Sequence, residues 1–173
     1  MQNEMIWFDR KFVFNLKIEM FPMVVERLRG CPARLEEKIK PLSDEVLTKK
    51  DGDHWSIQET VGHLVVVEQL WHGRFDDFMA GKRDLRPADI KNRLTKETDF
   101  HGFDINELLK SFRDSRIKLV DNLYGLSVEQ AALTAQHPRL DQPMRLIDSY
   151  YFAAEHDDHH LAKITDMIKK FEK

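Results

Sequence analysis

The sequence predicts an all-α fold, an antiparallel four-helix bundle with long connections between helices and an extended N-terminal arm. Four long segments repeat apolar residues at the spacing of an amphipathic helix. The seven glycines and six prolines lie mostly between these segments, and two of the connections are long. Helices joined in this way pack around one core, so residues 1–173 are expected to form a single domain.

The first 21 residues differ from the rest and are expected to form an aromatic arm laid over the bundle. Large apolar residues occupy every second position from Phe12 to Ile18, which is the period of an extended strand. The simplest expectation is that the arm packs on its own bundle. Its aromatic residues also raise the alternative of a contact between two subunits, and hence a homodimer.

A first helix is expected from Pro22 to about Ile39. It should kink or break at Gly30-Cys31-Pro32, because proline cannot donate the backbone hydrogen bond that a continuous helix needs. The polar run at 43–45 closes this segment, and residues 47–53 are predicted to form a loop.

The second helix has a clear start signal. Ser56 and Glu59 match the S-x-x-E capping box, and the apolar pattern then continues to about Met79. Residues 81–103 form a long, charged connection with a short helix expected near 88–93. A connection of this length is where a binding site is expected to have its lid.

The third and fourth helices follow from similar signals. Asp104 is placed to cap a helix that ends before Gly125, and residues 127–141 form a second connection. The longest helical pattern runs from Met144 to about Phe171.

Two histidines one helical turn apart stand out on that last helix. His156 and His160 project within about 40 degrees of each other, so both imidazoles can bind a single metal ion. His63, on the second helix, is the best candidate for a third ligand. His159 points elsewhere around the helix and is expected to be a supporting or surface residue.

These residues also have ordinary explanations. A chain with eight histidines can place two at this spacing by accident, and His63 can be a hydrogen-bonded core residue. Asp157, Asp158 and Glu59 lie near enough in sequence to orient an imidazole, although charges solvated on a helix surface are the more ordinary explanation of all three. Together, however, three imidazoles that leave coordination positions open are typical of catalytic metal sites, and they suit zinc, nickel, iron or copper.

The composition argues against several classes of protein. The net charge is −3 with basic and acidic residues intermixed, so no basic stripe for nucleic acid is present. No apolar run approaches the roughly 20 residues that span a bilayer, so neither membrane insertion nor export is expected. The sole cysteine, Cys31, favours a reducing, cytoplasmic location and is expected to be an inert thiol. Ser56 is better explained as a helix cap than as a nucleophile, and no phosphate-binding loop is found.

The motif Trp55-Ser56-x-x-Glu59-x-x-x-His63-Leu64, followed by His156-x-x-x-His160-Leu161-Ala162-Lys163-Ile164, resembles the DinB-like superfamily over roughly residues 22–171. It is similar to the subgroup that includes bacillithiol transferases. The resemblance implies a four-helix bundle with one divalent metal ion, held by one histidine of the second helix and two of the fourth. Carried over onto this sequence, those ligands are His63, His156 and His160.

The resemblance also implies a reaction. Characterised members use the metal to activate a low-molecular-weight thiol, so the expected function is a metal-dependent transferase with zinc, nickel or iron as the ion. No side chain need act as the nucleophile, and no catalytic residue beyond the ligands is assigned. The expected substrate is a small molecule. Two alternative functions remain: hydrolysis by a metal-bound water, or a non-catalytic bundle that binds a ligand or partner.

Overall fold

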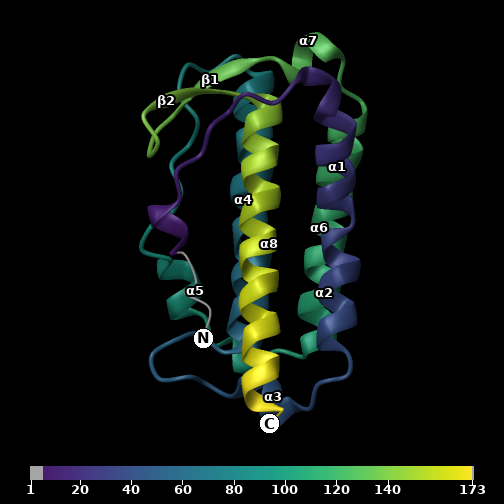
Figure 1. Cartoon of the computed structure of the whole chain (residues 1–173), viewed down its shortest axis with the longest axis vertical. Helices are drawn as coiled ribbons and strands as arrows, with labels where there is room; N and C mark the ends of the chain where they lie inside the picture. The colour runs from purple at the N-terminus through teal and green to yellow at the C-terminus, as the bar shows by residue number, and fades with distance from the viewer. Residues whose placement is uncertain (1–5, 173) are drawn as a thin grey trace.

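The computed structural model describes residues 6–172 and consists of four helical columns arranged as a bundle (Figure 1). The first column is made of two helices placed end to end, and each of the others is one long helix. These helices are α1 (Phe21–Arg29), α2 (Cys31–Ile39), α4 (Ile57–Met79), α6 (Ile105–Tyr124) and α8 (Leu146–Phe171). The predicted helical bundle is confirmed, with one small hairpin added to it.

Two columns run in each direction along the bundle (Figure 1). The long helices α4 and α6 are consecutive in the chain but run parallel, because the connection at 80–104 returns along the length of the bundle. This connection passes over α4 and carries a short helix that contacts it. The length of the predicted connection is therefore what permits this topology.

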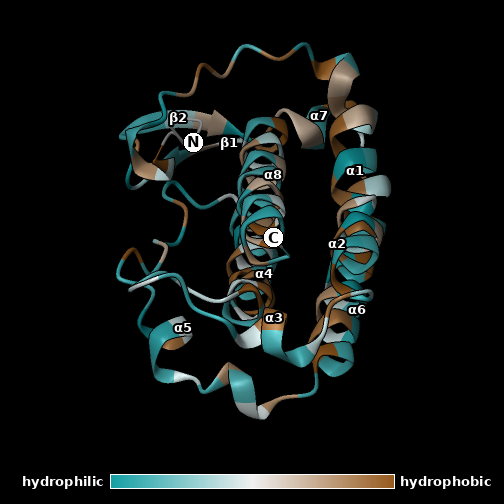
Figure 2. Ribbon diagram, turned by 60° about the horizontal axis from the view of Figure 1, so that its bottom comes forward, coloured by the Kyte–Doolittle hydropathy of each residue, from teal (hydrophilic) through white to brown (hydrophobic). Residues whose placement is uncertain are grey.

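The apolar core divides into two clusters along the bundle. One lies toward the end that carries the hairpin and includes Leu28 and Trp71, and the other lies toward the opposite end and includes Leu64 and Phe112. Each long helix shows hydrophobic and hydrophilic stripes in Figure 2, as the apolar periodicity predicts. Among the described residues, no helix is both long and apolar enough to cross a bilayer.

The N-terminal arm packs on its own bundle. From Phe12 to Ile18 the side chains alternate between half-buried and exposed, and the rings of Trp7 and Phe12 lie 5.0 and 4.8 Å from that of Phe152 on α8. The strand-like spacing therefore reflects one face laid on the helices, without a strand ladder among the described residues. Residues 1–5 of the predicted arm lie outside the described part of the chain. The two short 3₁₀ turns of the arm are Trp7–Asp9 and Ile18–Met20.

The structure contains the helix N-termini and the helix break that the sequence predicts. The capping box forms, with the Ser56 N–H donating to Glu59 Oε2 at 2.8 Å and the Glu59 N–H donating to Ser56 Oγ at 3.1 Å. Asp104 caps α6. The first column breaks at Gly30, as expected, because Pro32 in the first turn of α2 has no N–H to continue the helix.

Two short helices depart from the predictions. The predicted loop at 47–53 is wrong at its start, because the hydroxyl of Ser43 caps one helical turn, α3 (Asp44–Thr48). The short helix expected near 88–93 lies later, as α5 (Arg93–Glu97). The carboxylate of Asp89 accepts from the N–H of Arg93, the first residue of α5, at 2.6 Å. Asp89 therefore precedes the helix in which it was expected to lie.

The second connection contains more structure than a loop. A short helix, α7 (Val128–Ala131), is followed by the antiparallel strands β1 (Thr134–His137) and β2 (Gln142–Arg145). This hairpin was not predicted, and its second strand occupies the position at which the fourth helix was expected to begin. The helix α8 starts at Leu146 because the carboxylate of Asp148 accepts from the Arg145 N–H at 3.2 Å.

Candidate metal centre

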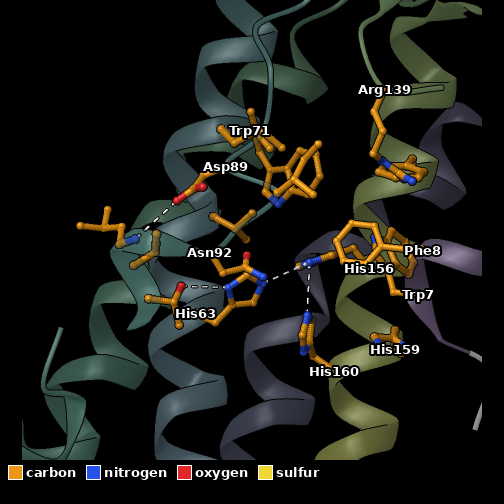
Figure 3. Close-up of a pocket in the computed structure, with 18 of the residues that line it drawn as sticks. Trp7, Phe8, His63, Trp71, Asp89, Asn92, Arg139, His156, His159 and His160 are labelled. Atoms are coloured by element: carbon orange, nitrogen blue, oxygen red, sulfur yellow. Dashed lines mark hydrogen bonds between the residues drawn. The ribbon is translucent and has the colours of Figure 1, made fainter. Parts of the chain in front are cut away.

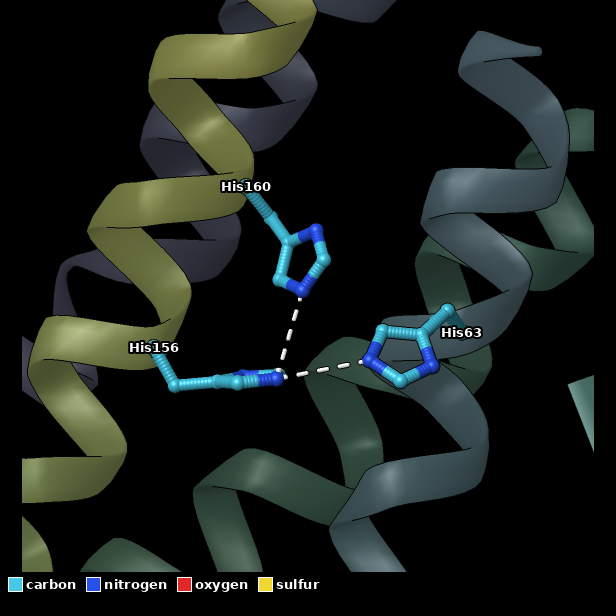
Figure 4. A group of neighbouring side chains, drawn as sticks. All are labelled: His63, His156 and His160. Atoms are coloured by element: carbon cyan, nitrogen blue, oxygen red, sulfur yellow. Dashed lines mark hydrogen bonds between the residues drawn. The ribbon is translucent and has the colours of Figure 1, made fainter. Parts of the chain in front are cut away.

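Three buried histidines converge between α4 and α8 (Figure 4). The Nε2 atom of His156 lies 3.3 Å from Nε2 of His63 and 3.2 Å from Nε2 of His160. The three side chains together offer one nitrogen each within 4.8 Å of one another. The helical pair and the distant histidine that the sequence singles out are therefore brought to one point.

The spacing of these nitrogens suits a single small ion. Metal–nitrogen bonds of about 2.0 to 2.1 Å at tetrahedral angles place two ligand nitrogens roughly 3.3 to 3.4 Å apart. The observed separations of 3.2 and 3.3 Å match that value. A neutral imidazole has one ring proton and one ring nitrogen with a free lone pair, so each of the three rings can direct a lone pair at the shared centre. The donor set therefore fits a divalent metal ion.

The ring of His63 is held by the connection that crosses α4. Its Nδ1 atom lies 3.1 Å from the hydroxyl of Thr95, a buried residue of α5. If Nδ1–H donates to that hydroxyl, the lone pair of Nε2 faces the other two histidines. The short helix therefore holds the ring of His63 in place and offers a partner for the tautomer that a ligand needs.

Burial keeps the imidazoles of His63 and His160 neutral. Desolvation, with a smaller contribution from the neighbouring His156, lowers the pKa of His63 to about 3. The same two effects lower the pKa of His160 well below its ordinary value. Neutral imidazole is the form that binds metal, so His63 and His160 need no deprotonation at pH 7.

Asp157 is not a solvated helix charge, and that expectation is wrong. Its side chain is fully buried and forms an ion pair with Arg116, which also binds Glu68 on α4. Burial alone would raise the pKa of Asp157, but the charge and hydrogen bonds of Arg116 hold it at about 2. One carboxylate oxygen lies 4.0 Å from Nδ1 of His156, so a fixed negative charge stands behind this imidazole.

The other two acidic candidates are engaged elsewhere. Asp158 is half-buried and accepts from Arg27 at 2.8 Å and from Arg34 at 2.7 Å. Glu59 completes the capping box and lies 2.8 Å from the ammonium of Lys50. Both are therefore explained by ion pairs and helix capping.

A cavity of about 570 Å³ opens beside the three histidines (Figure 3). Its walls come from four parts of the chain: the N-terminal arm, α4, the segment at 86–95 and the hairpin with α8. The aromatic side chains among the lining are Trp7, Phe8, Trp55, Trp71 and Phe152. The long connection, where a lid was expected, thus lines the cavity. The contribution of the arm was missed, because nothing local in the sequence places it over the histidines.

His159 lies in the wall of this cavity. Its ring is half-buried, with its centroid 5.6 Å from that of Trp7 and 5.3 Å from that of His160. Desolvation lowers the pKa of His159 to about 4. The residue is therefore a neutral wall residue next to the ligand candidates, as Figure 3 shows, and not a surface group.

The two nucleophile candidates that the sequence discounts are sequestered. Cys31 is fully buried, and burial raises the pKa of its thiol well above the ordinary value. The Ser56 hydroxyl is also fully buried, where it caps α4 and lies 2.9 Å from Nε2 of His101. Neither side chain lines the cavity.

Comparisons with known proteins agree with this arrangement. The model of the DinB superfamily matches residues 27–164. A solved structure of YfiT from Bacillus subtilis, described as a probable metal-dependent hydrolase with an unusual four-helix bundle topology, superposes with a TM-score of 0.83. It is 20% identical in sequence, and the match covers 94% of each chain, so it supports the fold. No curated protein matches the sequence. The family match extends from the first helical column into α8 and includes all three converging histidines, and the chain therefore belongs to the DinB superfamily.

Proposed function

We propose that this protein is a metal-dependent enzyme that acts on a small molecule and binds one divalent ion through His63, His156 and His160. The observation that carries the proposal is the convergence of their Nε2 atoms at 3.2 and 3.3 Å beside a cavity. Three protein ligands leave coordination positions open, as in catalytic sites. The bound ion would supply Lewis-acid chemistry and favour the deprotonated form of a group that binds there.

Transfer to a low-molecular-weight thiol is the reaction we propose first. Trp7, Phe8 and Trp71 form an aromatic wall beside the histidines, and such a wall excludes water from the reacting groups. Exclusion of water favours a nucleophile other than water. The cavity volume of about 570 Å³ is within the range of small-molecule sites.

Hydrolysis is the second candidate, and the description of YfiT as a probable metal-dependent hydrolase favours it. In this case water would be the attacking group at the same centre. The two reactions differ in one requirement. A transferase needs a thiol cosubstrate for turnover, whereas a hydrolase does not.

Metal analysis of protein purified without a histidine tag tests the centre. We expect about one divalent ion per chain, and loss of that ion in the His63→Ala, His156→Ala double variant. His72→Ala is a matched control, because this histidine is on α4 but binds Ser115. Full metal content in the double variant would refute the ligand assignment. Activity assays on the metal-loaded protein, with and without a thiol, then separate transfer from hydrolysis.

A further inference from the structure

A second group of polar side chains lines the same cavity without a role in the proposed metal centre. It consists of Arg74 on α4, His137 at the end of β1, and Arg139 in the hairpin turn. In Figure 3, Arg139 lies at the upper end of the view and the three metal-ligand candidates lie toward the lower end. Arg139 therefore lies in another part of the cavity, and Arg74 is about three helical turns from His63 along α4.

The guanidinium of Arg74 is buried, and no carboxylate of residues 6–172 forms an ion pair with it. Its side chain is 1% exposed, and among the described residues it makes only two long hydrogen bonds, both of 3.4 Å, to the carbonyl of Arg86. Desolvation lowers its pKa to about 10. A buried cation is costly unless an anion compensates it, so this arginine is poised for a negative ligand.

Arg139, in the turn of the hairpin, is the second arginine of the group and has similar surroundings. Its guanidinium carbon lies 5.3 Å from the centre of the Phe8 ring and 5.8 Å from that of Phe152. Within the described part of the chain, Nη2 is buried without a hydrogen-bond partner and no carboxylate pairs with this residue. Aromatic rings orient the guanidinium but do not satisfy the N–H donors of Nη2.

His137 contributes a donor whose direction is fixed. Its Nδ1 atom accepts from the backbone N–H groups of Arg139 and Leu140 at 3.2 and 3.1 Å, so the ring proton is on Nε2. Nε2 is buried and has no partner among residues 6–172. Burial, followed by the charges of Arg74 and Arg139, lowers the pKa of His137 to about 3, which keeps the ring neutral.

Among the described residues, no carboxylate forms an ion pair with this group, although the charge of nearby Asp77 favours the charged form of Arg74. Asp89 is the only acidic residue among the described residues that line the cavity, and its carboxylate already accepts from the backbone N–H groups of Arg93 and Leu94. Arg86, which also lines the cavity, is paired with Asp77. The net positive lining contrasts with the chain's net charge of −3.

We propose that Arg74, Arg139 and His137 form a binding site for the oxyanion of the substrate, a carboxylate or a phosphate group. Two guanidinium forks and one imidazole N–H match the acceptor oxygens of such a group. This inference rests on the proposed function to the extent that it names the substrate class of the same cavity. The substrate would be a small organic anion, held at its charged end by these residues while its reacting group faces the histidines.

Binding of simple aromatic anions tests the proposal. Tryptophan fluorescence would be titrated with benzoate, phenyl phosphate and the neutral benzamide, because Trp7 and Trp71 line the cavity. We expect one of the two anions to bind at least about tenfold more tightly than benzamide, and the better one identifies the oxyanion. Arg139→Gln should weaken that binding at least about tenfold, and Arg74→Lys should weaken it less than Arg74→Gln does.

A matched control variant, and a repeat of each titration on protein without the metal ligands, make the result specific. Arg93→Gln removes the same charge from an exposed position close to the cavity and should change binding less than about twofold. Each titration is repeated on the His63→Ala, His156→Ala variant, so that an anion bound only by the metal is recognised. Anion binding retained there and lost in Arg139→Gln supports the oxyanion site even if the metal proposal fails. Equal binding of benzamide and the anions, or an unchanged Kd in both folded Arg139→Gln and folded Arg74→Gln, would overturn it.

Discussion

Two buried arginines of this protein have opposite surroundings. Arg116, between α4, α6 and α8, forms ion pairs with Glu68 and Asp157 and is fully enclosed. Arg74, only two turns further along α4 from Glu68, is nearly as buried but has no carboxylate partner among the described residues. The comparison separates structure from function, because a buried charge that is fully paired needs no ligand and one that is unpaired does.

The largest effect is expected from breaking the paired region. Arg116→Met would leave two buried carboxylates without their counter-ion, which should lower the free energy of unfolding by about 3 to 5 kcal/mol. Urea denaturation monitored by circular dichroism measures this loss. Arg113 is on α6 like Arg116 and forms a half-exposed pair with Glu36 on α2, so Arg113→Met should cost about 1 kcal/mol or less. Equal losses in both variants would show that the buried network is not a structural element.

The next effect concerns the proposed metal centre, which lies beside Arg74 in the same cavity. The proposed divalent ion, bound by the three histidines, would stabilise the folded state by about 2.7 kcal/mol at a free concentration of 100 times its Kd. Chelation should therefore lower Tm, and addition of zinc, nickel or iron should restore it. The His63→Ala, His156→Ala variant is the control, and its Tm should not respond to added metal. A parallel Tm shift in that variant would place the ion elsewhere.

The buried histidines of the cavity and the buried carboxylate of Asp157 should also titrate in different pH ranges. His63 and His137 have folded-state pKa values of about 3, below the ordinary value of 6.5, so the unfolded chain binds more protons between these pH values. Stability is thus fully present above pH 6.5 and falls by at most about 1.4 kcal/mol per pH unit for each such histidine as the pH decreases toward 3. Asp157, with a pKa of about 2, should matter only below about pH 4.

Denaturation curves of the chelated protein at pH 7, 6, 5 and 4 measure this dependence. His137→Gln should flatten it by up to the contribution of one histidine, because the neutral amide does not titrate. A curve that is flat from pH 7 to pH 4 would contradict the buried neutral state of these imidazoles.

The smallest expected effect tests whether the short helix α5 supports the proposed metal centre. Thr95→Val removes the hydroxyl that lies 3.1 Å from Nδ1 of His63 but preserves the shape of the side chain. Metal affinity should fall about tenfold or more, while stability should fall by only about 1 kcal/mol. Competition with a fluorescent chelator measures the affinity. Thr98→Val, which removes an exposed hydroxyl on the same segment, is the control and should leave the metal affinity unchanged.

Some of the fold and of the candidate site could be predicted from local sequence. The capping box at Ser56 and Glu59, the cap at Asp104 and the break before Pro32 act within one or two helical turns, so their signals are adjacent in the chain. The same is true of the i, i+4 spacing of His156 and His160. The hairpin and the true position of α5 were not predicted, because short elements depend on contacts with the bundle more than on their own sequence.

The sequence by itself determined the helices, their caps and two neighbouring imidazoles, because hydrogen bonds and side-chain periodicity over a few residues decide these features. Tertiary structure alone decided which buried polar groups are paired. It brought Arg116 to Asp157 and Glu68 and placed Trp7 over the histidines. Within residues 6–172 it left Arg74 and Arg139 without a carboxylate partner. The physical reason is that the cost of burying a charge depends on partners from distant segments, which only the packed bundle brings together.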